Sequence, residues 1–175
     1  YEYKSYICKF WSNRVCIKSK TKRSKKLEKT LILLKPDAVQ RNLSGEIIKI
    51  LEQTGYKIIG MKFMILPLEK ANDHYSEHKD KPFFNDLVSF ITSSPIIAIA
   101  LEGPNCVGKI RSLMGKTNPS EALPGTIRGD YGVSLSMNLI HGSDSAESAN
   151  RELKIFFNDD ELYSYNKNID DWILE

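Results

Sequence analysis

The sequence predicts an α/β (α+β) fold with the element order β-α-β-β-α-β, an inserted helical pair and a four-stranded antiparallel sheet. From residue 30 onward, short apolar runs of strand length alternate with stretches in which apolar residues recur at helical spacing. The chain has 175 residues, of which 41% are hydrophobic, and this is enough for one packed core. The longest apolar run, residues 95–101, is too short to cross a bilayer and is typical of a buried strand.

The first half of the chain predicts two strands and three helices. A short apolar run over 30–34 predicts the first strand. A helix is predicted over 44–54, because its apolar residues recur at helical spacing and a glycine follows as a stop signal. The remaining predictions are a strand over 57–65 and two short helices over 68–78 and 83–92.

The second half continues the alternation. Residues 95–101 predict the third strand, and residues 105–114 predict a helix. A fourth strand is predicted over 132–137 and a last helix over 143–156. Without the inserted helical pair, the order is that of the ferredoxin-like fold.

Charge divides the chain near its N-terminal end. Residues 1–26 carry nine Lys and Arg side chains against one acid, a net charge of +8; the whole chain is +3, so the remainder is −5. The composition predicts a basic extension over residues 1–27 and one domain over residues 28–175. The extension is interpreted as a disordered arm, an organelle-targeting remnant, or a contact for nucleic acid or an acidic membrane, with a solvated tail of no function as the alternative.

Cysteine usage bears on the compartment. Cys8, Cys16 and Cys106 match neither a zinc spacing nor a disulfide framework, which favours a reducing environment. The expected location is cytoplasmic, with a mitochondrion or another organelle as the alternative if the basic extension is a targeting remnant.

The run of residues 138–145 contains the strongest candidate for a catalytic residue, His141. An imidazole titrates near neutrality, so a ring nitrogen can attack phosphorus without a separate strong base. Gly142 is expected to let another group approach the ring, and Ser143 to cap a helix whose free N–H groups attract anions. The alternative for a lone histidine is a surface residue or a hydrogen-bonded core residue.

Five further runs accompany the His141 run in a fixed order: residues 34–41, 74–75, 81–84, 117–119 and 124–130. Together they closely resemble the nucleoside diphosphate kinase family over residues 28–175, and the His-Gly-Ser-Asp-Ser and Pro-Gly-Thr-Ile-Arg-Gly-Asp runs are highly specific. The resemblance implies the ferredoxin-like fold and a two-step exchange. A nucleoside triphosphate would phosphorylate His141, and phospho-His141 would pass the group to another diphosphate.

The resemblance also implies a set of phosphate-binding residues. Arg111, Thr117 and Arg128 would contact the nucleotide phosphates, with Lys35 helping the transferred group and the sugar. Tyr75 would donate its hydroxyl to the phosphoryl group. The planar fork of arginine suits delocalised phosphate charge, although any one arginine alone is more often a solvated or salt-bridged surface residue. The alternative for Tyr75 is a core tyrosine.

By the same resemblance, Glu152 supports the nucleophile. Its carboxylate, hydrogen-bonded by Ser143, would bond one ring nitrogen of His141 and leave the other to attack. Such a pairing fixes the tautomer and stabilises positive charge on the ring. Without a nucleophilic His141, Glu152 would be interpreted as an exposed helix acid.

The resemblance also implies which residues bind the base and the ribose of the nucleotide. Phe83 would stack on the base opposite Leu135, where the family commonly has valine, and Asn138 and Lys35 would bond the ribose hydroxyls. Stacking tolerates all common bases, so the expected substrates are ATP, GTP, UTP, CTP, their deoxy forms and the diphosphates. The implied cofactor is Mg²⁺ carried by the nucleotide phosphates, and no cluster in the sequence resembles a dedicated metal cage. The alternative for Phe83 is inward packing.

Four positions depart from the family pattern. Ser136 and Met137 stand where glycine and arginine are usual, which puts a local turn and a salt bridge in doubt. Ala38 and Asn42 replace common glycines. None of these departures removes a proposed catalytic group.

A rival phosphate-binding motif lies at residues 103–109, which have the spacing of a P-loop after a predicted strand. Ile110 stands where a P-loop needs Ser or Thr to ligate Mg²⁺, and Pro104 removes an amide from the loop. A plain connection between strand and helix is therefore expected.

Two other classes of function are open alternatives: a catalytically silent relative acting as a scaffold, and a nucleic-acid-binding regulator that uses the basic extension. All proposed catalytic groups are present, and the acidic remainder offers no obvious basic face. The ending over residues 170–175 resembles the long C-terminal ending of eukaryotic family members, which are typically hexamers, and its apolar cluster at residues 172–174 is expected to be buried against a neighbouring subunit. A homo-oligomer, specifically a hexamer, is expected, with docking of the C-terminus onto its own core as the alternative.

Overall fold

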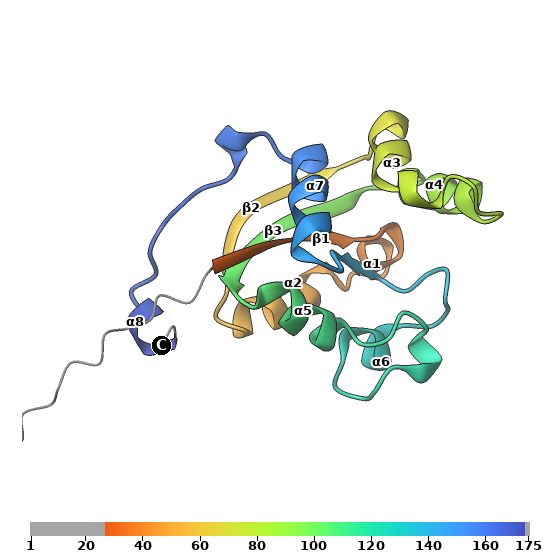
Figure 1. Ribbon diagram of the computed structural model, residues 1–175. Helices are drawn as coiled ribbons and strands as arrows, with labels where there is room; N and C mark the ends of the chain where they lie inside the picture. The colour runs from red at the N-terminus through yellow and green to blue at the C-terminus, as the bar shows by residue number, and fades with distance from the viewer. Residues whose placement is uncertain (1–26, 174–175) are drawn as a thin grey trace, which may run out of the picture.

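The computed structural model describes residues 27–173, which form a sheet with helices on both faces (Figure 1). The four strands pair in the order β2-β3-β1-β4, and every pairing is antiparallel. Their bounds are β1 Leu27–Leu34, β2 Lys57–Met64, β3 Ile96–Pro104 and β4 Ile140–Gly142. The predicted fold class is confirmed. The predicted basic extension, apart from its last residue, lies outside the described part of the chain.

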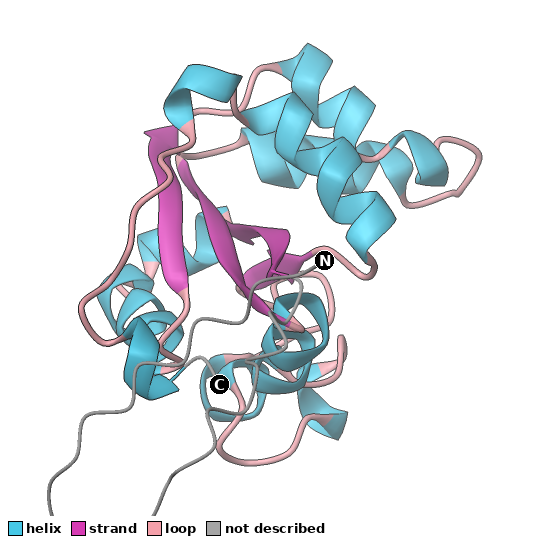
Figure 2. Ribbon diagram, turned by 60° about the vertical axis from the view of Figure 1, so that its left-hand side comes forward, coloured by secondary structure: helices cyan, strands magenta, loops and turns pink. Residues whose placement is uncertain are grey.

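Helices cover both faces of the sheet (Figure 2). On one face lie α3 Leu68–His74, α4 Phe84–Thr92 and α7 Ala146–Phe156. On the other face lie α1 Pro36–Gln40, α2 Ser44–Gln53, α5 Cys106–Met114 and α6 Ile127–Tyr131. Three short 3-10 helices complete the described part of the fold: η1 Ser76–His78 after α3, η2 Pro119–Glu121 before α6, and η3 Asp159–Glu161 after α7. The last element of the described chain is the short helix α8 Asp170–Ile173.

Strand β1 contributes to a hydrophobic core on each face, because successive side chains of a strand point in opposite directions. Leu31 and Leu33 pack into the core beneath α3, α4 and α7. Ile32 and Leu34 pack into the core beneath α1, α2 and α5. All four side chains are fully buried, and burial of each contributes roughly 1.5–3 kcal/mol to folding. The strand that leads to Lys35 is therefore held firmly on both sides.

The prediction of a fourth strand over 132–137 is wrong. That segment is irregular, and its apolar side chains Val133, Leu135 and Met137 are exposed. The fourth strand is β4, in which His141 pairs with Leu33 of β1. A strand of three residues is too short to show an alternating pattern, so sequence periodicity could not reveal it.

The expected helix start at Ser143 is also wrong. Helix α7 begins at Ala146, and its N-cap is Ser145, whose hydroxyl accepts a hydrogen bond from the Ser148 N–H at 3.0 Å. Ser143 instead lies inside the protein behind His141. Its hydroxyl is therefore free to take part in the site described below.

The segment with P-loop spacing is a plain connection between β3 and α5, as expected. Gly103 belongs to β3, and a side chain there would collide with the ring of Tyr56. The Tyr56 hydroxyl donates to the Pro104 carbonyl at 2.9 Å, which ties the same segment to the start of β2. The glycine serves close packing between strands.

The C-terminal segment runs back along the edge strand β2. The Tyr163 N–H donates to the Ile59 carbonyl at 2.7 Å, and the Lys57 ammonium lies 2.9 Å from the Asp170 carboxylate. Trp172 nevertheless is 86% exposed, so it does not dock onto its own core. No helix among residues 27–173 has the length and apolar character that a membrane crossing requires.

Candidate active site

His141 lies at the centre of a polar cavity of about 220 Å³ between β4, α3, α5 and α7. The cavity brings together residues that are far apart in the sequence, from Lys35 to Glu152. Seven of the predicted site residues line it: Lys35, Tyr75, Arg111, Thr117, Arg128, Asn138 and Glu152. The structure therefore gathers most of the sequence-predicted site around the predicted nucleophile.

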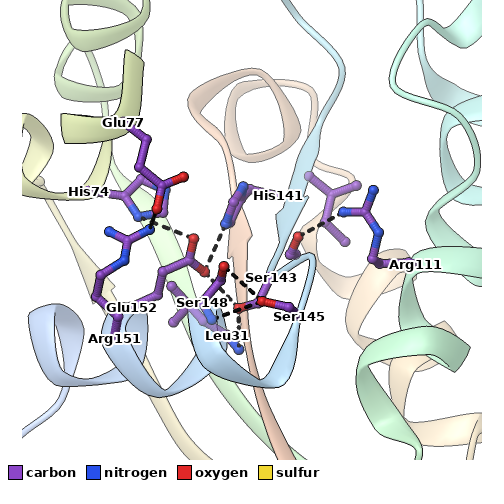
Figure 3. Close-up of polar contacts among 12 residues, drawn as sticks. Leu31, His74, Glu77, Arg111, His141, Ser143, Ser145, Ser148, Arg151 and Glu152 are labelled. Carbon is purple, nitrogen blue, oxygen red and sulfur yellow. Dashed lines mark hydrogen bonds and ion pairs between the residues drawn. The ribbon is translucent and has the colours of Figure 1, made fainter. Parts of the chain in front are cut away.

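Behind the His141 ring, a chain of hydrogen bonds reaches β1 (Figure 3). The His141 Nε2 lies 3.1 Å from Glu152 Oε2, and the Ser143 hydroxyl donates to the same oxygen at 2.6 Å. The Ser143 oxygen in turn accepts from the Leu31 N–H at 3.2 Å. The arrangement expected for Ser143, Glu152 and His141 is present in the structure.

The Glu152 carboxylate is ionised although it is only 5% exposed. Burial alone would raise its pKa, but the hydrogen bonds from His141 and Ser143 and the nearby ring bring the pKa below its usual value. An ionised carboxylate can only accept hydrogen bonds, so Nε2 of His141 carries the ring proton. The lone pair of His141 then resides on Nδ1.

His74 was not identified as a site residue from the sequence, yet it lies against both groups. Its ring centroid is 4.7 Å from that of His141 at an angle of 86°, and its Nδ1 lies 4.0 Å from Glu152 Oε1. His74 is only 4% exposed, and burial followed by the proximity of His141 lowers its pKa to about 3. It is a neutral imidazole at the buried end of α3, next to Tyr75.

Two arginines contribute positive charge to the cavity wall beside His141. The Arg128 guanidinium donates to the carbonyls of Gly115, Asn138 and Ile140 at 2.9, 3.3 and 2.7 Å. Burial and the nearby Arg111 lower the pKa of Arg128 to about 10, so it stays charged at neutral pH. Arg111 is more exposed and donates to the Gly142 carbonyl at 3.5 Å.

Lys35 stands directly after β1 and extends into the same cavity. Its ammonium donates to the Asn138 side chain at 2.7 Å, and its own N–H donates to the Leu139 carbonyl at 2.8 Å. The Leu139 N–H donates to the Asp37 carboxylate at 2.9 Å, which holds Leu139 at a φ of 70°. Burial and the charge of Arg128 lower the pKa of Lys35 to about 8.

A wider cavity of about 610 Å³ adjoins the first. It shares six lining residues with the polar cavity: Lys35, Tyr75, His78, Thr117, Asn138 and His141. Its rim carries Phe83, which is 48% exposed, and Leu135, which is 60% exposed. An open apolar rim beside a polar pocket is suited to a flat ring attached to a phosphate chain.

Gly142, Met137 and Asn42 each stand at a position with its own backbone requirement. A side chain at Gly142 would collide with the Met114 sulfur, so this glycine makes room for α5. The turn before Asn138 is closed by Ser134, whose hydroxyl accepts from the Met137 N–H at 3.2 Å. Asn42 has a φ of 58°, a conformation that asparagine tolerates better than most residues.

An ion pair at the cavity mouth was also missed from the sequence. Arg151 on α7 donates to Glu77 on η1 at 2.7 Å (Figure 3). Both side chains line the cavity and link the two helical elements on either side of it. Nothing in the sequence pattern pairs these residues, because they are 74 positions apart.

Known proteins resemble this chain closely. The family model described as nucleoside diphosphate kinase matches residues 28–162. A nucleoside diphosphate kinase of Staphylococcus epidermidis is 55% identical over 149 residues, which are 85% of this chain and 100% of that protein. One of Oceanobacillus iheyensis is 54% identical over 147 residues, 84% of this chain and 99% of that protein.

Solved structures agree with the sequence comparisons. The nucleoside diphosphate kinase of Halobacterium salinarum in complex with CDP is 49% identical, with a TM-score of 0.82 over 85% of this chain and 99% of that one. A nucleoside diphosphate kinase family protein from Babesia bovis is 44% identical, with a TM-score of 0.82 over 83% and 99% of the two chains. The similarity therefore covers almost all of the described residues.

Proposed function

Because the chain belongs to the nucleoside diphosphate kinase family, we propose that His141 is the residue that carries the phosphoryl group between nucleotides. The activity of the enzyme is transfer of the γ-phosphate of a nucleoside triphosphate to a nucleoside diphosphate. One observation supports the assignment most strongly: the ionised Glu152 holds Nε2 of His141 and leaves Nδ1 with its lone pair. Incubation with labelled ATP tests it, since a phosphohistidine is labile in acid and stable in base.

In the first half-reaction, Nδ1 of His141 attacks the γ-phosphorus. The bond from that phosphorus to the bridging oxygen breaks, and the nucleoside diphosphate leaves with the electron pair. The ring proton stays on Nε2, where the Glu152 carboxylate stabilises the positive charge that develops on the ring. A second diphosphate then attacks the phosphohistidine by the reverse path, which restores Nδ1.

Hydrogen-bond donors from three parts of the fold stabilise the negative charge on the phosphoryl group during transfer. Arg111 and Arg128 offer positive charge to the phosphoryl oxygens, and Lys35 does so from the end of β1. Burial raises the pKa of Tyr75 to about 12, so its hydroxyl keeps its proton and can donate it to the phosphoryl group. Thr117 completes the cavity wall beside Asn138.

We further propose that Mg²⁺ enters with the nucleotide. Mg²⁺ prefers oxygen ligands and retains several waters. Three carboxylates line the polar cavity: Glu152 bonds His141 and Ser143, Glu77 is paired with Arg151, and hydrogen bonds from Ser148 and Ser145 hold the pKa of Asp144 below its usual value. This arrangement fits an ion held by the phosphates, where it would neutralise the charge of the β- and γ-phosphoryl oxygens.

The open rim predicts broad base selectivity. If Phe83 and Leu135 contact only the faces of the base, purine and pyrimidine diphosphates should accept phosphate at similar rates. Phe83→Ala should lower kcat/KM for all of them by roughly tenfold, since stacking is worth about 1–3 kcal/mol per base. Steady-state kinetics with four diphosphates measure this; restriction to one base by roughly a thousandfold would require edge hydrogen bonds and contradict the proposal.

The lowered pKa of Lys35 predicts a pH dependence. Lysine is charged below its pKa, so the ammonium is present at neutral pH and lost as the pH rises through about 8. We expect kcat/KM, which reports the free enzyme, to fall above that pH because a neutral Lys35 no longer attracts phosphate. Lys35→Arg should have a lower maximum without this alkaline fall; an unchanged fall would assign it to another group.

We propose a hexamer, supported by apolar side chains that the single chain leaves exposed. Trp172 projects from the C-terminal segment, and Met61, Phe63 and Ile65 lie exposed on the edge strand β2. Light scattering should give the mass of six chains for the full protein and also for a form starting at Leu27. A monomer in both cases would refute the assembly, and a hexamer only with residues 1–26 would show that the extension is structural.

A further inference from the structure

Three potential metal ligands, one of them the proposed nucleophile, converge in the polar cavity, and two of the three already belong to the catalytic site. His74, His141 and Glu152 each present one ligand atom, and these atoms all lie within 4.8 Å of one another. They come from α3, β4 and α7; α3 and α7 pack on the same core, and β4 is held by its pairing with β1. Figure 3 shows the His74 and His141 rings on either side of the Glu152 carboxylate.

The three ligand atoms lie within 4.8 Å of one another, wider than the ligand spacing of an occupied zinc site. With bonds of about 2.0–2.1 Å, two ligands of a tetrahedral Zn²⁺ lie roughly 3.3 Å apart. His141 Nε2 and Glu152 Oε2 are 3.1 Å apart, and His74 Nδ1 and Glu152 Oε1 are 4.0 Å apart. Movement of the His74 ring toward Glu152 would bring the three ligand atoms within bonding distance of one ion. Two histidines and one glutamate with an open fourth position form a known class of zinc site.

His74 provides an independent indication of a ligand. Both ring nitrogens of this buried side chain lack a hydrogen-bond partner among the described residues. A buried polar group without a partner costs about 1–3 kcal/mol, so the protein retains an unsatisfied imidazole at its active site. The distance of 4.0 Å from Nδ1 to Glu152 is too long for a hydrogen bond but leaves room for a shared ion.

We propose that His74, His141 and Glu152 bind a divalent transition-metal ion of the Zn²⁺ type, and that the bound ion blocks phosphorylation of His141. Imidazole nitrogens favour Zn²⁺ over Mg²⁺, which prefers oxygen ligands. The ion would thus be separate from the Mg²⁺ of the nucleotide. The open position faces the polar cavity, where water can serve as the fourth ligand.

The block follows from the tautomer of the ring and rests on the proposed role of His141. A neutral imidazole has one N–H and one lone pair. Coordination of Zn²⁺ by Nε2 uses the lone pair there, so the ring proton must move from Nε2 to Nδ1. Nδ1 then has no lone pair with which to attack phosphorus. The ion also takes the carboxylate that would stabilise positive charge on the ring.

Metal binding can be tested without measuring activity. The full chain, freed of metal by a chelator, is titrated with Zn²⁺ in competition with a chromophoric chelator. We expect saturable uptake of one ion per chain. His74→Phe should weaken the affinity at least tenfold, because loss of even an outer-shell partner costs about 10–100-fold. His78→Phe is the matched control, since His78 lies outside the three-residue group, and it should bind as the parent does.

A second measurement uses the unaltered protein, so it does not depend on the folding of a variant. In spectra of protein labelled at histidine, Zn²⁺ should shift the ring signals of His74 and His141 and leave those of His78 in place. Absence of saturable uptake, equal affinity in His74→Phe, or shifts confined to His78 would each overturn the proposed site.

The inhibitory effect has its own test. Phosphorylation of His141 by Mg²⁺-ATP is followed while a nitrilotriacetate buffer fixes the free Zn²⁺ concentration. The concentration that halves the rate should rise at least tenfold in His74→Phe and stay constant in His78→Phe, each relative to its own uninhibited rate. Zn²⁺ binding without inhibition would overturn the proposed block alone. No phosphorylation of metal-free protein would instead refute the proposed function.

Discussion

Replacing His141 by alanine is expected to abolish phosphoryl exchange, by roughly 10⁴-fold or more, while the protein stays folded. The imidazole is the covalent carrier, and the neighbouring His74 is buried and cannot approach a nucleotide in its place. The His141 side chain is partly exposed, so its removal leaves the two cores intact. A coupled assay of exchange measures the loss, and circular dichroism confirms the fold.

The matched control is His78→Ala. His78 lines the same cavity but has no bond to Glu152. Labelled ATP should leave acid-labile phosphate on the parent and on His78→Ala and none on His141→Ala. Exchange by purified His141→Ala near the parental rate would remove the central claim about the nucleophile.

Glu152→Gln is expected to lower kcat by about 10–100-fold with little change in KM. The amide keeps the shape of the side chain but carries no charge, so the positive ring in the transition state loses a charge-assisted hydrogen bond worth about 1.5–3 kcal/mol. The His141 ring also loses the carboxylate that fixed its proton on Nε2 and left the lone pair on Nδ1. The substrate contacts at Lys35 and Arg111 remain, which is why KM should hold.

Glu147→Gln serves as the control for this change, because Glu147 is an exposed acid in the first turn of the same helix. It should exchange phosphate at the parental rate. If Glu152→Gln also matched the parent, Glu152 would contribute only to packing. If its KM rose with kcat unchanged, Glu152 would act in nucleotide binding.

The sequence predicted the elements whose length allows a pattern to develop. Helix α2 and strands β2 and β3 were placed within a few residues, because each has eight or more residues and shows either a periodic pattern or, in β3, a continuous apolar run. Strand β4 has three residues and the preceding Leu139 has a positive φ, so neither shows in a local pattern. The most important strand for the chemistry was thus the least predictable.

The site residues were found through motifs and not through periodicity. His141 and Arg128 stand in runs that are specific enough to be recognised one at a time. His74 stands beside Tyr75 in such a run, yet its closeness to Glu152 depends on how α3 and α7 pack over the sheet. The pairing of Glu77 with Arg151 depends on the same packing. Contacts between distant elements require the three-dimensional fold, which local pattern cannot supply.

The hydrogen bonds around Arg128 and Lys35 also bear on the cost of substrate binding. Arg128 is fixed by three backbone carbonyls, and Lys35 by Asn138, so their charges are oriented by the protein itself. Such donors are preorganised, and their loss of side-chain freedom is part of folding rather than of nucleotide binding. An enzyme that shuttles phosphate in both directions benefits from this rigidity. The same fixed charges of Arg128 and Lys35 can bind the triphosphate of one nucleotide and the diphosphate of the next, without rearrangement between the two half-reactions.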